Sequence, residues 1–260
     1  MSTLSPVTAL PGTLAPVRSH ISSFPTSGGD PEYITHVCIC SGIATPSIPR
    51  YTPHSPALLV PTQTAALEQI VAVSLGDGSV RAHSLPTEGP VTEIFRSPAF
   101  EGGSACFVAK SLGTSVRIIT GGWDGTVRAF SFDATSSPSA SSPSPEAAII
   151  KVPFNDSATA LAQLDGGLLL VGTEKGMIHF YDASSSPARL LGTYTQAHSD
   201  AVSVLVPHPS RPALVMSGGE DGTVAVHDIS RPDEDSACLS VMNAGCPVRR
   251  AGFFGGGNWE

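Results

Sequence analysis

The sequence predicts an all-β repeat protein, and three observations lead to this prediction. Glycine and proline are abundant, with 26 and 23 residues among 260, which is typical of many short strands joined by tight turns. Four segments of the chain can be aligned with one another. Within each of them, apolar and polar residues alternate with a period of two, as they do on the two faces of a β-strand.

The four segments share one layout: an apolar run, a short turn that ends in glycine, and a second alternating run. They span residues 70–85, 116–132, 168–183 and 213–229, with turn glycines Gly78, Gly125, Gly176 and Gly222. The intervals between these glycines are 47, 51 and 46 residues, which matches a four-stranded β-propeller blade with modest loop insertions. One hairpin cannot bury both of its apolar faces, so neighbouring units are expected to stack and stabilise each other.

Further strands are predicted between these hairpins. Outer strands are expected at residues 91–96, 189–194 and 237–242, and inner strands at residues 105–109, 158–163 and 201–206. Residues 247–253 are expected to open a fifth blade. The hairpins and these strands together predict about four blades plus the first strand of a fifth.

The pattern resembles WD40 repeats. In that family a Trp-Asp pair follows the turn glycine by five and six residues, and the corresponding pairs here are His83-Ser84, Phe130-Ser131, Tyr181-Asp182 and His227-Asp228. The tryptophan is therefore absent from every unit, and the aspartate is kept in two. The Gly-His dipeptide that opens a repeat survives only as Ala197-His198. Residues 194–237 are similar to one subfamily in particular, through a Thr-x-x-His-Ser-Asp entry, a His-Pro-Ser step and a late acidic stretch.

The resemblance implies an all-β, WD40-type β-propeller over residues 31–260. Because such propellers usually close with about seven blades, the prediction is an incomplete propeller, an open arc with exposed strand edges at both ends. In the family the N-terminal strand supplies the outer strand of the last blade. Residues 33–40 are therefore expected to take that closing role and not to pair within the first blade.

Two segments are too rich in Ser, Pro and Thr to build a core. Residues 1–30 are predicted to be a disordered tail, and residues 134–147 a disordered insert between the inner and outer strands of the second blade.

Composition disfavours several classes of function. The net charge of −8 disfavours nucleic-acid binding. No apolar run reaches 18 residues and no signal-peptide layout is present, so we expect no membrane association and a location in the cytoplasm or nucleus. The five cysteines form no CxxC pair, and Cys38 and Cys40 have no second ligand pair with matching spacing, so we expect no metal and no cofactor.

Histidine, serine and aspartate recur around the fourth repeat. These are the residue types of a catalytic triad, but no serine lies in a GxSxG turn, so no catalytic residue is predicted. The WD40 resemblance implies instead a structural hydrogen-bond network of His198, Ser217 and Asp221, with His227 at the position of the usual tryptophan. Imidazole offers a donor but less packing area, so this network is expected to be weaker than the usual one.

The turn tips supply candidate residues for partner binding. Trp123 lies at the tip of the second turn, and Glu174 and Glu220 occupy the equivalent position in later units. An exposed tryptophan is a common interface anchor, and the alternative is that Trp123 folds back on its own blade. The leading hypothesis is a non-catalytic scaffold that binds protein partners. The alternatives are a propeller fragment without independent function, and a propeller that binds a small molecule or is an enzyme.

Overall fold

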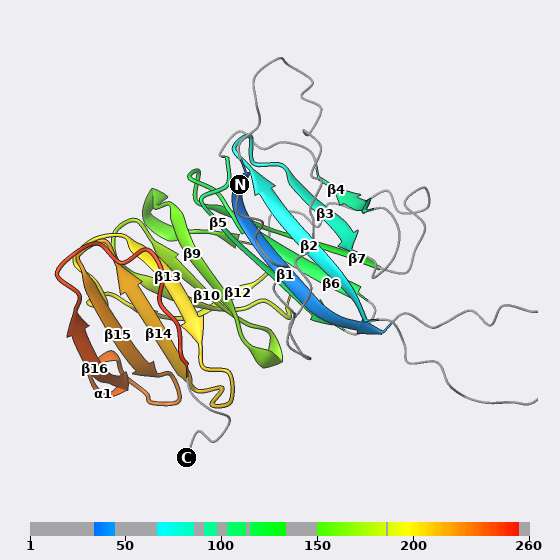
Figure 1. Ribbon diagram of the computed structural model, residues 1–260. Helices are drawn as coiled ribbons and strands as arrows, with labels where there is room; N and C mark the ends of the chain where they lie inside the picture. Colours follow the sequence, from blue (N-terminus) through cyan, green and yellow to red (C-terminus); the bar gives the residue numbers. More distant parts are fainter. Residues whose placement is uncertain are drawn as a thin grey trace, which may run out of the picture. The chain divides into compact units, whose positions relative to one another are not determined.

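The chain folds as a series of antiparallel β-sheets, seen here in a computed structural model. The structure describes residues 34–44, 67–85, 91–97, 103–112, 115–133, 150–185 and 187–254. It contains four sheets of four strands each, and in every sheet the strands are hydrogen-bonded in chain order (Figure 1). Each sheet is therefore an antiparallel meander, as expected when turns of a few residues connect successive strands. We call the sheets blades 1 to 4 in chain order.

The first two blades come from the N-terminal half of the described chain. Blade 1 consists of β1 Ile34–Ala44, β2 Leu67–Leu75, β3 Val80–Leu85 and β4 Thr92–Arg96. Blade 2 consists of β5 Cys106–Leu112, β6 Ser115–Gly121, β7 Thr126–Asp133 and β8 Ile150–Lys151. A short 3-10 turn, Pro153–Asn155, leads out of blade 2.

The last two blades have the same layout. Blade 3 consists of β9 Ala158–Gln163, β10 Leu168–Thr173, β11 Ile178–Asp182 and β12 Arg189–Tyr194, with a second 3-10 turn at Asp165–Gly167. Blade 4 consists of β13 Val202–Pro207, β14 Leu214–Gly219, β15 Thr223–Asp228 and β16 Cys238–Asn243. The one-turn helix α1, Glu234–Ala237, precedes β16.

Three apolar clusters join successive blades. The cluster between blades 1 and 2 includes Ile70, Phe95 and Phe130. The cluster between blades 2 and 3 includes Cys106 and Tyr181, and the cluster between blades 3 and 4 contains residues such as Phe180, Tyr194 and Val202. Each middle blade thus packs both of its faces against a neighbouring blade. This is why its strands carry apolar residues on both sides.

The structure confirms the predicted fold class. All six predicted inner and outer strands are found within one or two residues at their starts: β4, β5, β9, β12, β13 and β16. The four aligned hairpins are β2–β3, β6–β7, β10–β11 and β14–β15, and their turn glycines have positive φ values between 72° and 81°.

The closing role predicted for residues 33–40 is wrong. The strand β1 pairs with β2 inside blade 1, with Val37 opposite Val73 and Ile39 opposite Val71. It therefore takes the position that β5 takes in blade 2, and the Cys38 thiol lies 3.6 Å from the carbonyl of Ala109 on β5. The physical reason is local. The apolar strand β2 offers a matching partner nearby in the chain, so β1 pairs there.

The predicted fifth-blade strand at residues 247–253 is also not formed in the described part of the chain. This segment lies on blade 4 instead: the Val248 N–H donates to the carbonyl of Gly219 at 3.1 Å, and Ser203 Oγ donates to the carbonyl of Val248. A strand needs a hydrogen-bonded neighbour on its free side, and none of the described residues provides one. The predicted disordered segments, 1–30 and 134–147, lie outside the described residues.

Candidate functional site

The turns between the second and third strands gather the candidate residues at one edge of each blade. In three blades the turn aspartate accepts a hydrogen bond from the main-chain N–H two residues later: Asp77 from Ser79 at 2.8 Å, Asp124 from Thr126 at 2.9 Å and Asp221 from Thr223 at 2.9 Å. Such an aspartate turn fixes the backbone locally and lets the next glycine adopt positive φ. In blade 3 Lys175 replaces the aspartate, and Thr173 Oγ1 accepts from the N–H of Met177 at 3.2 Å.

The four network residues predicted in blade 4 lie together. His198 Nε2 lies 2.8 Å from Ser217 Oγ, and Ser217 Oγ lies 3.1 Å from His227 Nε2. On its other side, His198 Nδ1 is 2.9 Å from Thr223 Oγ1 and 3.3 Å from Asp221 Oδ1. Thr223 is the one member that the sequence did not suggest.

The donors and acceptors in this network can be assigned starting from the carboxylate of Asp221. A carboxylate only accepts, so His198 Nδ1 carries the proton that faces Asp221, and in the neutral form of His198 the other ring nitrogen, Nε2, is an acceptor. The Ser217 hydroxyl therefore donates to His198, and its oxygen accepts from His227 Nε2–H. This assignment leaves His227 Nδ1 as the buried atom with no partner among the described residues.

Electrostatics favour a neutral His227 and an ionised Asp221 at neutral pH. Burial, with a smaller contribution from the neighbouring His198, lowers the pKa of His227 to about 4. Burial alone raises the pKa of Asp221, but hydrogen bonds from the N–H groups of Thr223 and Ser199 outweigh it and hold this pKa at about 2. The Ser217 side chain is completely buried, so its hydroxyl cannot reach a substrate. The arrangement can brace a blade, because every link ties one strand or turn to another.

The residues predicted to bind partners lie at the turn tips. Trp123 is 58% exposed, so its side chain does not fold back into the core of blade 2. The hydroxyl of Ser157 lies within reach of two acceptors, the Trp123 carbonyl at 3.0 Å and Glu174 Oε2 at 2.8 Å, and its one hydrogen can be donated to either. The N–H of Glu174 also donates to the Ser157 carbonyl at 3.2 Å. Glu220 forms an ion pair with Arg249 at 2.8 Å.

A second exposed aromatic residue escaped the sequence analysis. Phe154, in the connection between blades 2 and 3, is 74% exposed and has a φ of 61°, and Asn155 after it has a φ of 50°. No repeat pattern covers this connection, because the inter-blade loops differ from one unit to the next. The only signal in the sequence is an apolar residue between Pro153 and Asn155, which is too weak to mark a site.

The described residues contain no group of three or more histidine, cysteine or acidic side chains placed to hold a metal ion. The only α-helix among them, α1, has four residues, and no helix there is long and apolar enough to cross a membrane.

Four-stranded meanders that stack face to face through apolar clusters are the blades of a β-propeller. The family model of the WD domain, G-beta repeat, matches residues 188–228, which run from the end of blade 3 to β15. The chain is therefore similar to the WD40-repeat β-propellers in its fold and, over residues 188–228, in its sequence. Its repeats depart from the WD40 pattern, because the tryptophan position is occupied by other aromatic or imidazole rings.

Individual relatives agree with this placement. The chain is similar to a WD repeat-containing protein 89 homolog from Dictyostelium discoideum, with 27% identity over 92 residues, which cover 35% of this chain and 25% of that protein. The match thus spans about a quarter of that relative's length. The subfamily that residues 194–237 resemble in sequence is that of WD repeat-containing protein 89.

Solved structures share the fold. A chain from a crystal structure of the mitotic checkpoint complex superposes with a TM-score of 0.52 at 17% identity, over 72% of this chain and 54% of that chain. Sqt1 from Chaetomium thermophilum gives a TM-score of 0.52 at 19% identity, over 69% of this chain and 45% of that chain. At these identities the likeness concerns the fold alone. WD40 propellers as a class are generally scaffolds for protein interactions.

Proposed function

We propose that this chain is a non-catalytic WD40 scaffold that binds protein partners through the turn edge of blades 2 and 3, with Trp123 as an anchor. The observation that carries this proposal is the 58% exposure of Trp123 on a turn that hydrogen bonds hold in place. Tryptophan is enriched among the residues that dominate interface energies, because it offers a large rigid surface at a small entropic cost. A tryptophan held out in solvent has no comparable stabilising role within its own blade.

The polar cluster in blade 4 supports a scaffold over an enzyme. Ser217 and His227 are almost completely buried, and each link of their network joins elements of the blade itself. Catalysis needs a nucleophile and a base that reach a substrate.

The experiment is quantitative affinity purification of the tagged chain from cells, comparing the wild type with Trp123→Ala. The expected result is loss of a defined set of co-purifying proteins in the variant. Leu191→Ala is the matched control, because Leu191 is also an exposed apolar residue but lies on β12, the outer strand of blade 3. An unchanged set of proteins with Trp123→Ala would exclude Trp123 as the anchor.

A melting experiment separates a scaffold from an inactive fragment. A soluble monomer with one cooperative thermal transition supports a working domain, whereas aggregation at micromolar concentration supports the fragment. Trp123→Ala should change the free energy of unfolding by no more than about 0.5 kcal/mol, as expected for an exposed position.

A further inference from the structure

The outer strand of blade 4 is an exposed apolar edge. The strand β16 is the last of its sheet, and no other described strand pairs with its outer side (Figure 1). Three of its residues are apolar and about half exposed or more: Leu239 at 44%, Val241 at 61% and Met242 at 52%. An exposed apolar edge strand is a template for a further strand, because its outward main-chain N–H and C=O groups can bond to one.

The outer strands of the other three blades carry charges that oppose such pairing. In β4, Glu93 and Arg96 form an ion pair at 2.8 Å. The two-residue strand β8 ends in Lys151, and β12 begins with Arg189. Charged residues, proline and short length are the usual protections of sheet edges. The sequence of β16, CLSVMN, contains neither a charged residue nor proline.

Only part of this edge is regular. The pairing of β16 with β15 shifts register at Leu239, which lies opposite no residue, and is regular from Ser240 to Asn243. A bulge disrupts the ladder locally and bends the strand, so a neighbouring strand can lie flat only against the regular part.

The direction of the main-chain groups in this regular part follows from one hydrogen bond. The N–H of Ala244, directly after β16, donates to the Gly222 carbonyl at 2.7 Å. In an antiparallel ladder alternate residues bond to the same neighbour, so Met242 also bonds inward to β15. Val241 and Asn243 therefore point their N–H and C=O groups outward.

We infer that β16 pairs with β16 of a second copy of this chain, antiparallel and about a two-fold axis at Met242. In this register Val241 of each copy lies opposite Asn243 of the other, so the outward N–H and C=O groups of both residues form hydrogen bonds. Met242 lies opposite Met242 of the second copy in a non-hydrogen-bonded pair, where side chains approach most closely. Two four-stranded blades thereby become one eight-stranded sheet.

The distribution of charge favours a second copy in this orientation. A two-fold axis brings a residue near its own counterpart, so a charge close to the axis would meet a like charge, and β16 carries none. The acidic residues Asp233, Glu234 and Asp235 lie just before the strand. Antiparallel pairing keeps the two acidic groups at opposite ends of the joined strands, whereas parallel pairing would bring them together.

This inference goes beyond the scaffold function and does not depend on it. A pairing of four residues is small beside stable interfaces of about 1,200–2,000 Å², so we expect a dissociation constant above about 10 μM and a monomer at lower concentrations. Each copy has one β16, so the association stops at two copies and differs from open-ended aggregation.

Disulfide trapping at the axis tests the register. Met242→Cys is made in a background in which every cysteine except the buried Cys106 is replaced by serine. The two Cα atoms of a non-hydrogen-bonded pair lie about 4.5 Å apart, which a disulfide can span. Under mild oxidation, covalent dimers should form at least about 10-fold faster than with Leu191→Cys in the same background, because pairing raises the effective thiol concentration. Leu191 on β12 is the matched control, since its exposure of 51% equals that of Met242.

A charge on the edge tests the strand pairing itself. Val241→Lys should lower the cross-linking rate of Met242→Cys to that of the Leu191→Cys control, whereas the uncharged Val241→Thr should change it by less than about 2-fold. Sedimentation velocity at about 100 μM should show dimer in the wild type and in Trp123→Ala, and monomer in Val241→Lys. Thermal melting checks that each variant keeps the fold.

The contrary results overturn the inference in different ways. Equal cross-linking rates for Met242→Cys and Leu191→Cys would show that β16 has no preferred pairing. Rapid cross-linking that Val241→Lys does not slow would mean that side chains meet without strand pairing. A wild type that stays monomeric at about 100 μM excludes the dimer, and none of these results bears on partner binding through Trp123. Large aggregates in both the wild type and Val241→Lys would refute the dimer and support the inactive fragment.

Discussion

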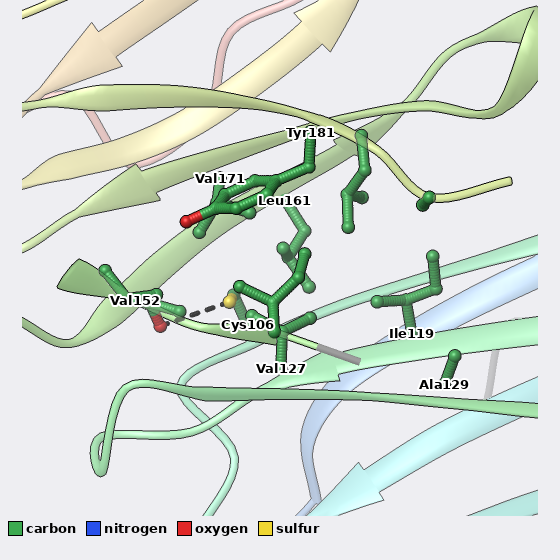
Figure 2. Close-up of a cluster of buried hydrophobic side chains, with 12 residues drawn as sticks. Cys106, Ile119, Val127, Ala129, Val152, Leu161, Val171 and Tyr181 are labelled. Carbon is green, nitrogen blue, oxygen red and sulfur yellow. Dashed lines mark hydrogen bonds between the residues drawn. The ribbon is translucent and has the colours of Figure 1, made fainter. Parts of the chain in front are cut away.

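Blades 3 and 4 have the same strand layout but are braced by different chemistry. In blade 4 the buried Ser217 bridges two histidines and, through His198, reaches the aspartate of the turn. In blade 3 the residues at the same distances before and after the turn glycine are Val171 and Tyr181. Both belong to the apolar cluster between blades 2 and 3, where the Cys106 thiol donates to the Ala158 carbonyl at 3.2 Å (Figure 2).

The difference shows which part of the repeat defines a blade. A blade can form without such a network, because blade 3 has the same four-stranded meander and lacks it. Both blades keep the positive-φ glycine of the turn, with φ of 81° at Gly176 and 79° at Gly222, and both keep apolar faces toward their neighbours. Blade 3 also carries buried polar atoms without partners among the described residues, His179 Nε2 and Tyr181 Oη. Each such atom lowers the stability of the folded state by about 1–3 kcal/mol. The mainly apolar packing of blade 3 therefore also carries an energetic cost.

The largest effect is expected at the turn glycines, where the two blades can be compared directly. A Cβ on Gly176 would lie 2.3 Å from the carbonyl oxygen of His198, whereas one on Gly222 would lie 3.2 Å from that of Cys246. Left-handed backbone costs a non-glycine residue about 1–2 kcal/mol at either site, and only Gly176→Ala adds a main-chain clash. We expect Gly176→Ala to lose about 3 kcal/mol or more and Gly222→Ala about 1–2 kcal/mol in denaturant unfolding. Equal losses would show that the clash is relieved by movement of the loop.

The next effect concerns the histidines of the two blades. His198→Ala removes a buried ring with three hydrogen-bonding partners, and His179→Ala removes a buried ring with one, Thr193 Oγ1 at 2.8 Å. Both changes remove the same imidazole ring from a buried position, so the difference reports the hydrogen bonds of the network. We expect His198→Ala to lower the free energy of unfolding by about 2–4 kcal/mol, which is about 1–2 kcal/mol more than His179→Ala. A smaller loss at His198 would argue that the network contributes no net stability.

The sequence predicted the features that depend on local chemistry. The turn glycines and period-two alternation located the four hairpins β2–β3, β6–β7, β10–β11 and β14–β15, because positive φ favours glycine and a two-faced strand requires alternating residue types. The prediction for β1 failed because strand pairing depends on which partner is free, and alternation in Ile34–Ala44 fits either position. Phe154 was missed because exposure and strain are properties of the folded loop, and Thr223 because a threonine in a strand is unremarkable by itself.

Ser217 in blade 4 and Val171 in blade 3 occupy equivalent positions. Exchanging their residue types tests whether each residue is suited only to its own blade. Ser217→Val deprives two histidines of their shared partner, and Val171→Ser buries a hydroxyl in an apolar cluster. Each change should cost about 1–3 kcal/mol, the usual penalty for a buried polar group without a partner. Ser217→Thr keeps the hydroxyl and serves as the control, with a smaller loss from the added methyl. If Ser217→Val were neutral, the histidines would have to find other partners, which nuclear magnetic resonance of their ring nitrogens would reveal.

The smallest effect is a dependence of stability on pH that should be traceable to His227. Burial lowers its pKa to about 4 in the folded chain, while the unfolded chain keeps a value near 6.5, so the unfolded state binds more protons between these values. The stability from neutral His227 is therefore complete above about pH 6.5 and is lost as the pH falls toward 4. Between pH 7 and pH 5.5 the free energy of unfolding should fall by about 1 kcal/mol through His227 alone.

His227→Tyr places the residue of blade 3 at this position and removes the titrating group. Because His36, His83 and His179 also have pKa values lowered by burial, the informative quantity is the difference between the wild type and this variant. The variant's stability should fall less steeply over this range, as measured by urea unfolding at each pH. Parallel curves would mean that His227 titrates alike in both states, and that the neutral network is not what holds blade 4 together.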